Sequence, residues 1–179
     1  MDDIIITGIV GSIILVLGSA LPESRKNIQP VKSVKNWLFG IGSFIMLFYA
    51  IFGYFGGESI FFVILEILVA ISIILMMLNT QDKVDTIILV LSSVALIIWS
   101  LYLFESYYTL IFILGLCGVS LGFAFESGTL RRSTALVLGS GLIAVFSYTE
   151  MSWIFFWLNL FFAIFSAYYM YKGFVQKRS

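Results

Sequence analysis

The sequence predicts an all-α integral membrane protein with seven transmembrane helices, and three observations carry that prediction. Hydrophobic residues make up 61% of the 179 residues and charged residues only 11%, whereas a soluble domain has about 25% charged residues. The apolar residues fall into seven runs long enough to approach or cross a hydrocarbon core of about 30 Å. Every Lys and Arg lies in a connection between runs or in the C-terminal tail, as expected of a multi-pass protein.

The seven runs are bounded by charged residues, Pro, Gly or Asn, which commonly end membrane helices. They cover roughly residues 4–21, 37–55, 59–79, 86–104, 108–125, 133–148 and 152–171. Only residues 56–58 separate the second run from the third, so these two should form a tight hairpin. The one long connection is 22–36. The runs leave almost no chain for a soluble domain, so residues 1–179 are expected to form a single membrane domain.

The basic residues predict the orientation of the chain. They lie in the first, third and fifth connections and in the C-terminal tail: Arg25, Lys26, Lys32, Lys35, Lys83, Arg131, Arg132, Lys172, Lys177 and Arg178. With seven crossings these segments share one side of the membrane. The other side has acids but no base: Asp2, Asp3, Glu58, Glu105 and Glu150. Because basic loops stay in the cytoplasm, we expect a multi-pass protein of the cell membrane with its N-terminus outside and its C-terminus cytoplasmic.

The composition excludes several kinds of activity. The sequence has no histidine, which removes histidine-ligated metals and Ser-His nucleophile pairs. Glu66 is the one acid deep in an apolar run, so a two-carboxylate intramembrane protease is excluded. The net charge of zero gives no electrostatic footprint for nucleic acid. We therefore expect neither an enzyme nor a protein with a metal or cofactor.

Glu66 is the candidate centre of function. It lies near the middle of the run 59–79, where a charged side chain costs at least about 2.5–3.5 kcal/mol on insertion scales. Desolvation disfavours its charged form, so we expect a protonated carboxyl unless a cation or water is present. Proton coupling, a counter-charge for a cationic solute, and a structural hydrogen bond between helices all remain open.

Three matches indicate an internal duplication. Phe62-x3-Glu66 in the third run aligns with Phe155-x3-Asn159 in the seventh. Glycines recur in the other two pairs of runs: Gly8 and Gly11 with Gly115 and Gly118, and Gly40 and Gly42 with Gly139 and Gly141. Two parallel three-helix units need one extra crossing between them, and the fourth run supplies it. We expect repeats at 1–80 and 106–179, joined by a linker helix at 81–105.

This layout resembles the PQ-loop/SWEET family over essentially the whole chain. The first unit carries the resemblance: a glycine-rich run ending in Leu21 and Pro22, a basic connection, Trp37 opening the second run, and FFxxxE in the third. The family places a pocket asparagine in the third helix of each bundle. Asn159 matches that position and Glu66 departs from it. The Pro-Gln dipeptide of the family is Pro-Glu here, and the second unit has Gly-Thr in its place.

The resemblance implies a transporter that moves a small polar, sugar-like solute by alternating access. Glu66 and Asn159 would bind the solute or a coupled proton near the midplane. Tyr49 and Trp157 would stack around it as further substrate-binding residues, and Pro22 would be a hinge. The expected partners are the solute and the lipid bilayer; proton coupling and a homo-oligomer stay open.

Two other functions also stay open. One is a vitamin or nucleoside facilitator of the nicotinamide riboside type, which shares the 3+1+3 plan and whose aromatic-rich pocket would suit Trp157. The other is a non-transporting membrane receptor or assembly subunit, as KDEL-type receptors are on a related fold. Solute flux separates transport from the latter.

The charge asymmetry gives a testable prediction of orientation. A cysteine at Ser106 should react with an impermeant thiol reagent in intact cells, because its connection contains acid and no base. A cysteine at Ser133, beside the basic pair, should react only after permeabilisation. Both changes are made in a Cys117→Ser background, which removes the native thiol. Labelling of position 133 in intact cells would contradict the orientation.

Overall fold

The chain forms seven α-helices within the residues that the computed structural model describes, which are 2–21, 33–78, 82–126 and 129–178. The helices are α1 (Asp2–Ala20), α2 (Val34–Phe55), α3 (Ile60–Leu78), α4 (Asp82–Tyr102), α5 (Tyr107–Ala124), α6 (Leu130–Thr149) and α7 (Trp153–Arg178). Each is long and apolar enough to cross a membrane. The predicted all-helical chain with seven potential spans is therefore confirmed, while Pro22 lies outside the described residues.

Several helices extend beyond the apolar runs because their ends depend on capping and not on hydrophobicity. The hydroxyl of Ser33 accepts a hydrogen bond from the amide of Asn36 at 3.4 Å, so α2 begins before residue 37. The hydroxyl of Thr129 accepts one from the amide of Arg132 at 3.3 Å, which starts α6 earlier than 133. Such caps satisfy amide groups that the first turn of a helix leaves unpaired.

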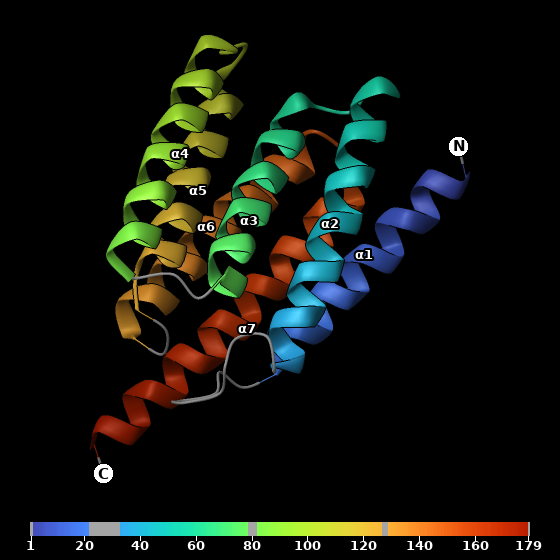
Figure 1. The fold of residues 1–179 in the computed structure, drawn as a ribbon. Coiled ribbons are helices and arrows are strands. Elements are labelled where there is room, and N and C mark those ends of the chain that lie inside the picture. The colour runs from blue at the N-terminus through green and yellow to red at the C-terminus, as the bar shows by residue number, and fades with distance from the viewer. Residues whose placement is uncertain (1, 22–32, 79–81, 127–128, 179) are drawn as a thin grey trace.

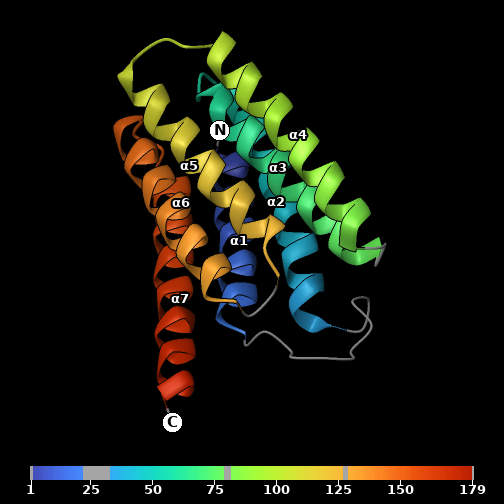
Figure 2. The same ribbon diagram turned by 90° about the vertical axis from the view of Figure 1, so that its left-hand side faces the viewer.

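The helices form a closed ring in chain order (Figures 1 and 2). Each helix packs against the next, α7 packs back against α1, and α3 also contacts α5. The α2–α3, α4–α5 and α6–α7 connections lie at one end of the bundle, and the C-terminus lies at the other. The connections at the first end carry Glu58, Glu105 and Glu150. The described basic residues lie toward the opposite end, so the end with these three acids carries no base, as in a membrane protein with charges outside the hydrocarbon region.

The α2–α3 and α6–α7 turns are built alike. In each, three successive amides bond back to carbonyls four, three and five residues earlier. The pairs are Gly56 to Phe52 (3.1 Å), Gly57 to Tyr54 (3.1 Å) and Glu58 to Gly53 (2.9 Å), then Glu150 to Phe146 (3.0 Å), Met151 to Tyr148 (3.2 Å) and Ser152 to Ser147 (2.9 Å). The middle residue has positive φ in both turns, 100° at Gly57 and 56° at Met151. Two segments far apart in the sequence thus adopt one turn conformation.

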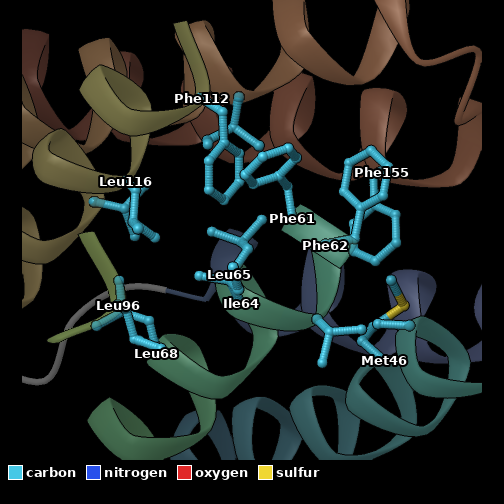
Figure 3. Packing of buried hydrophobic residues seen from close by; sticks show 14 of the residues in the cluster. Met46, Phe61, Phe62, Ile64, Leu65, Leu68, Leu96, Phe112, Leu116 and Phe155 are labelled. Carbon is cyan, nitrogen blue, oxygen red and sulfur yellow. The ribbon is translucent and has the colours of Figure 1, made fainter. Parts of the chain in front are cut away.

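An aromatic cluster fills the ring near the end that holds these turns (Figure 3). The rings of Phe62 and Phe155 stack with centroids 4.3 Å apart and planes 4° from parallel. Phe61 packs on Phe112 with ring centroids 4.9 Å apart, and Phe146 contacts both Phe61 and Phe62. Aromatic pairs of this kind contribute about 0.5–1.5 kcal/mol each beyond the area they bury. The cluster joins α3, α5, α6 and α7 into one core.

Glycines bring α5 and α6 into close contact. A Cβ added at Gly118 would lie 2.6 Å from the Cα of Gly139 and 2.9 Å from its amide nitrogen. Both are backbone atoms, which cannot turn aside as a flexible side chain can. Small residues at such a crossing allow the close packing on which membrane helices depend. Gly141 is different, because an added Cβ there meets no described atom within 4 Å.

These two positions give a matched test of the packing. We expect Gly118→Ala to lower the free energy of unfolding by about 1–3 kcal/mol, because the helices must move apart. The control Gly141→Ala should be neutral or stabilise by up to about 1 kcal/mol, since alanine favours helix over glycine. Thermal unfolding of the purified protein in detergent measures both. Equal melting temperatures for the two variants would contradict the close crossing.

Candidate functional site

Glu66 lies in the interior of the ring on α3. It is 2% exposed, and its Oε2 atom has no hydrogen-bond partner among the described residues. A buried polar atom without a partner costs about 1–3 kcal/mol, so such atoms are few in folded proteins and call for an explanation. The neighbours of Glu66 along α3 are apolar, and most of them are buried. A carboxyl group held in these surroundings is suited to binding a proton, a cation or a hydrogen-bond donor.

The Phe62–Phe155 stack brings Asn159 to the same depth as Glu66. Glu66 is four residues after Phe62 on α3, and Asn159 is four residues after Phe155 on α7. The two helices run in the same direction (Figure 1), so both polar residues lie about 6 Å along the helix axis from the stacked rings. Asn159 is also buried, and its Nδ2 donates to the carbonyl of Phe155 at 2.9 Å. The predicted pair thus shares one layer of the interior.

Tyr49 lies beside the stack, with its hydroxyl engaged away from Glu66. Its ring packs against Phe155 with centroids 5.6 Å apart. Its hydroxyl donates to Oε1 of Glu58 at 2.7 Å, and the hydroxyl of Ser152 donates to Oε2 of the same carboxylate at 3.5 Å. Tyr49 therefore covers the layer that holds Glu66 and Asn159 from the side of the turns.

The Tyr49–Glu58–Ser152 cluster is a feature that the sequence analysis missed. The sequence places Glu58 in a connection, and in the structure its carboxylate bridges α2 to the start of α7. The N-terminal ends of α3 and α7 favour a carboxylate nearby. Gly53 makes room for it, because a Cβ there would lie 3.1 Å from the Glu58 Oε2. That glycine, five residues before the acid, is the sequence signal that could have indicated the contact.

Trp157 is not brought to the interior. It is 52% exposed, and its ring contacts Phe156 and Phe161 on its own helix. Two residues along a helix correspond to a rotation of about 200°. Because Phe155 and Asn159 face inward, Trp157 between them faces outward. The structure places this candidate at the outer surface of α7 and not around Glu66.

An apolar groove of about 480 Å³ runs between α2 and α3 on the outer surface. It is lined by Trp37, Gly40, Ile41, Phe44, Ile45, Ile73, Ile74, Met77 and Leu78. Neither Glu66 nor Asn159 lines it, and its lining offers almost no polar atom. The groove is separate from the candidate site.

Comparison with known proteins gives no relative from which a function could be transferred. No protein-family model, no curated protein and no solved structure matches the chain. Within the described part of the chain, no three His, Cys, Asp or Glu side chains gather as a metal-binding group. The geometry of the interior is therefore the basis for the function proposed below.

The Tyr49–Glu58 bond yields a stability prediction. Tyr49→Phe removes a 2.7 Å hydrogen bond to a carboxylate and should lower the free energy of unfolding by about 1.5–3 kcal/mol. Tyr54→Phe on the same helix changes an exposed tyrosine and serves as the control. In a Glu58→Gln background the effect of Tyr49→Phe should shrink, because the charged acceptor is already gone. Thermal unfolding of the four variants and the wild type forms the cycle; independent effects at 49 and 58 would contradict the contact.

Proposed function

We propose that the chain is a membrane transporter that moves a small polar solute by alternating access, on a SWEET-like 3+1+3 plan. The observation that carries the proposal is the unpartnered Oε2 of Glu66, enclosed at the level of Asn159 in the middle of seven membrane-length helices. Ionisable residues within membrane helices commonly mark solute or proton pathways. A carboxyl and an amide at one depth are the groups that a polar solute needs to replace its water.

The helix contacts support two parallel repeats, α1–α3 and α5–α7. The contacts α1–α2, α2–α3 and α1–α7 have counterparts in α5–α6, α6–α7 and α3–α5, and α4 is the additional helix. The two matching turns fall at equivalent places in the repeats. The nearly parallel rings of Phe62 and Phe155 are the arrangement expected of equivalent residues that meet at a two-fold axis.

The contacts between the repeats suggest how access to Glu66 would alternate. At the acidic end, the Phe62–Phe155 stack and the Glu58–Ser152 hydrogen bond join the repeats. At the basic end, the hydroxyl of Tyr169 donates to the carbonyl of Ala20 at 2.8 Å and ties α7 to the end of α1. Opening one end while the other stays joined would expose Glu66 to one side at a time. The charge asymmetry supports an outer acidic end and a cytoplasmic basic end.

The principal alternative function is a non-transporting receptor or assembly subunit. A measurement of solute flux distinguishes it from a transporter. A vitamin or nucleoside facilitator gains no specific support, because the aromatic side chain that favoured it, Trp157, faces outward.

Uptake into proteoliposomes tests the proposal. We expect at least one labelled sugar, amino acid, amine or nucleoside to enter saturably, and Glu66→Gln to change that uptake by about tenfold or more, because the variant cannot bind or release a proton. Loss of pH-driven accumulation with intact exchange indicates proton coupling; loss of both indicates direct contact with the solute. The control Glu105→Gln, at an exposed acid, should leave uptake unchanged.

Two results would contradict the proposal. If no labelled solute enters faster than into empty liposomes, the chain is not a transporter of these classes. If uptake is saturable but Glu66→Gln equals the wild type, transport does not pass through Glu66.

A further inference from the structure

Ser43 differs in its hydrogen bonding from five other buried serines of the described helices. Ser43 Oγ and Glu66 Oε2 are the two buried side-chain polar atoms without a hydrogen-bond partner in the described chain. Five other buried serines donate to the carbonyl four residues earlier in their own helix: Ser72, Ser93, Ser100, Ser120 and Ser147. Ser43 lies within α2 and is 0% exposed, yet it makes no such bond. Its hydroxyl is available to a ligand.

Aromatic contacts place Ser43 in the same layer as Asn159. Toward the acidic end, Tyr49 on α2 packs on Phe155 of α7; toward the basic end, Phe39 of α2 packs on Phe162 of α7 with centroids 5.7 Å apart. Ser43 lies between the two contact residues of α2. Asn159 lies between the two contact residues of α7.

Glu66 belongs to the same layer through α3. It follows Phe62 by one helical turn, and Phe62 stacks on the same Phe155. A Cβ added at Gly40 would lie 3.8 Å from the side chain of Ile73, which gives the register of the α2–α3 hairpin. This register sets Ser43 and Glu66 within about one turn of each other in depth. The Ser43 hydroxyl and the Asn159 amide thus lie between two aromatic contacts, and the Glu66 carboxyl lies near the same depth, one turn beyond the Phe62–Phe155 stack.

We propose that Ser43, Glu66 and Asn159 form a binding site for a small organic cation that carries N–H donors. The inference deepens the proposed transport function by naming the class of solute. Glu66 supplies the opposite charge, while the Ser43 hydroxyl and the Asn159 amide oxygen accept N–H groups. The bracketing rings also favour a cation over a neutral solute of the same size.

The surroundings of Glu66 argue for a cation over a neutral polyol. The described Lys and Arg residues lie in the first turns of their helices or in the C-terminal part of α7, far from the central layer: Lys35, Lys83, Arg131, Arg132, Lys172, Lys177 and Arg178. A polyol could use the same hydrogen bonds only with a neutral carboxyl, because a charged carboxyl without a counter-charge is costly at this depth. An organic cation supplies the hydrogen-bond donors and also the charge that lets the carboxylate ionise.

Binding of guanidinium to the purified full-length protein in detergent tests the proposal. Guanidinium is planar, permanently charged and rich in N–H donors, and urea is its neutral counterpart of nearly the same shape. Isothermal titration with guanidinium chloride at millimolar concentration and constant ionic strength should give saturable binding, whereas urea and sodium chloride should give none. Glu66→Gln should abolish binding, and Ser43→Ala should weaken it about tenfold through the lost hydrogen bond to a charged group. Ser93→Ala, at a buried serine bonded to its own helix, should bind as the wild type does.

Any other pattern of binding to these ligands and variants overturns the proposal. Equal binding of urea identifies a neutral polar site, and equal binding of sodium identifies an inorganic cation site. Guanidinium binding that survives both Glu66→Gln and Ser43→Ala lies elsewhere. If Glu66→Gln fails to fold, the guanidinium affinities of Ser43→Ala and Ser93→Ala still test the site. Guanidinium binding without flux of any solute would contradict the transport function but not the cation site. Flux of a neutral solute without guanidinium binding would contradict the cation site but not the transport function.

Discussion

The contact between Phe62 and Phe155 is the interaction on which the arrangement of the interior depends. It joins two helices that are not neighbours in the ring and fixes how far each is turned and how deep each lies. With those two helices placed, Glu66 and Asn159 share a layer, and Tyr49 covers it from one side. Dispersion and ring geometry thus decide where the polar groups lie. The polar groups themselves contribute little to that placement. The Asn159 side chain donates a hydrogen bond to its own helix, and Glu66 Oε2 has no hydrogen-bond partner among the described residues.

The bundle contains two kinds of helix contact, one that depends on glycines and one that depends on aromatic rings. Glycines bring α1 close to α2 and α5 close to α6; an added Cβ at Gly11 or Gly115 would lie 2.8 Å from a side chain of the facing helix. The α3–α7 contact rests instead on aromatic rings. Backbones in close contact resist sliding, whereas rings on flexible side chains can turn and part. In the proposed cycle the glycine pairs would move as rigid bodies and the aromatic contact would open and close.

The sequence predicted the seven helices and the burial of Glu66 and Asn159 because both depend on local properties. The length of an apolar run and a lone acid within it are visible without knowing any neighbour. The bond between Tyr49 and Glu58 was not visible, since it depends on how the chain folds back after α2. The free hydroxyl of Ser43 was equally hidden, because nothing in the sequence separates it from serines that bond to their own helices. The outward position of Trp157, however, followed from its spacing to Phe155 and Asn159 and could have been predicted.

The left-handed backbone at Met151 has a consequence for the end of the molecule where it lies. Gly57 adopts the equivalent conformation freely, but a residue with a side chain is strained there by about 1–2 kcal/mol. Met151 precedes Ser152, whose hydroxyl donates to the Glu58 carboxylate in the α2–α3 connection. If the two turns move apart in the proposed cycle, that hydrogen bond breaks, and a relaxation of Met151 would return energy of similar size. The strained residue would then lower the net free-energy cost of opening this end of the bundle.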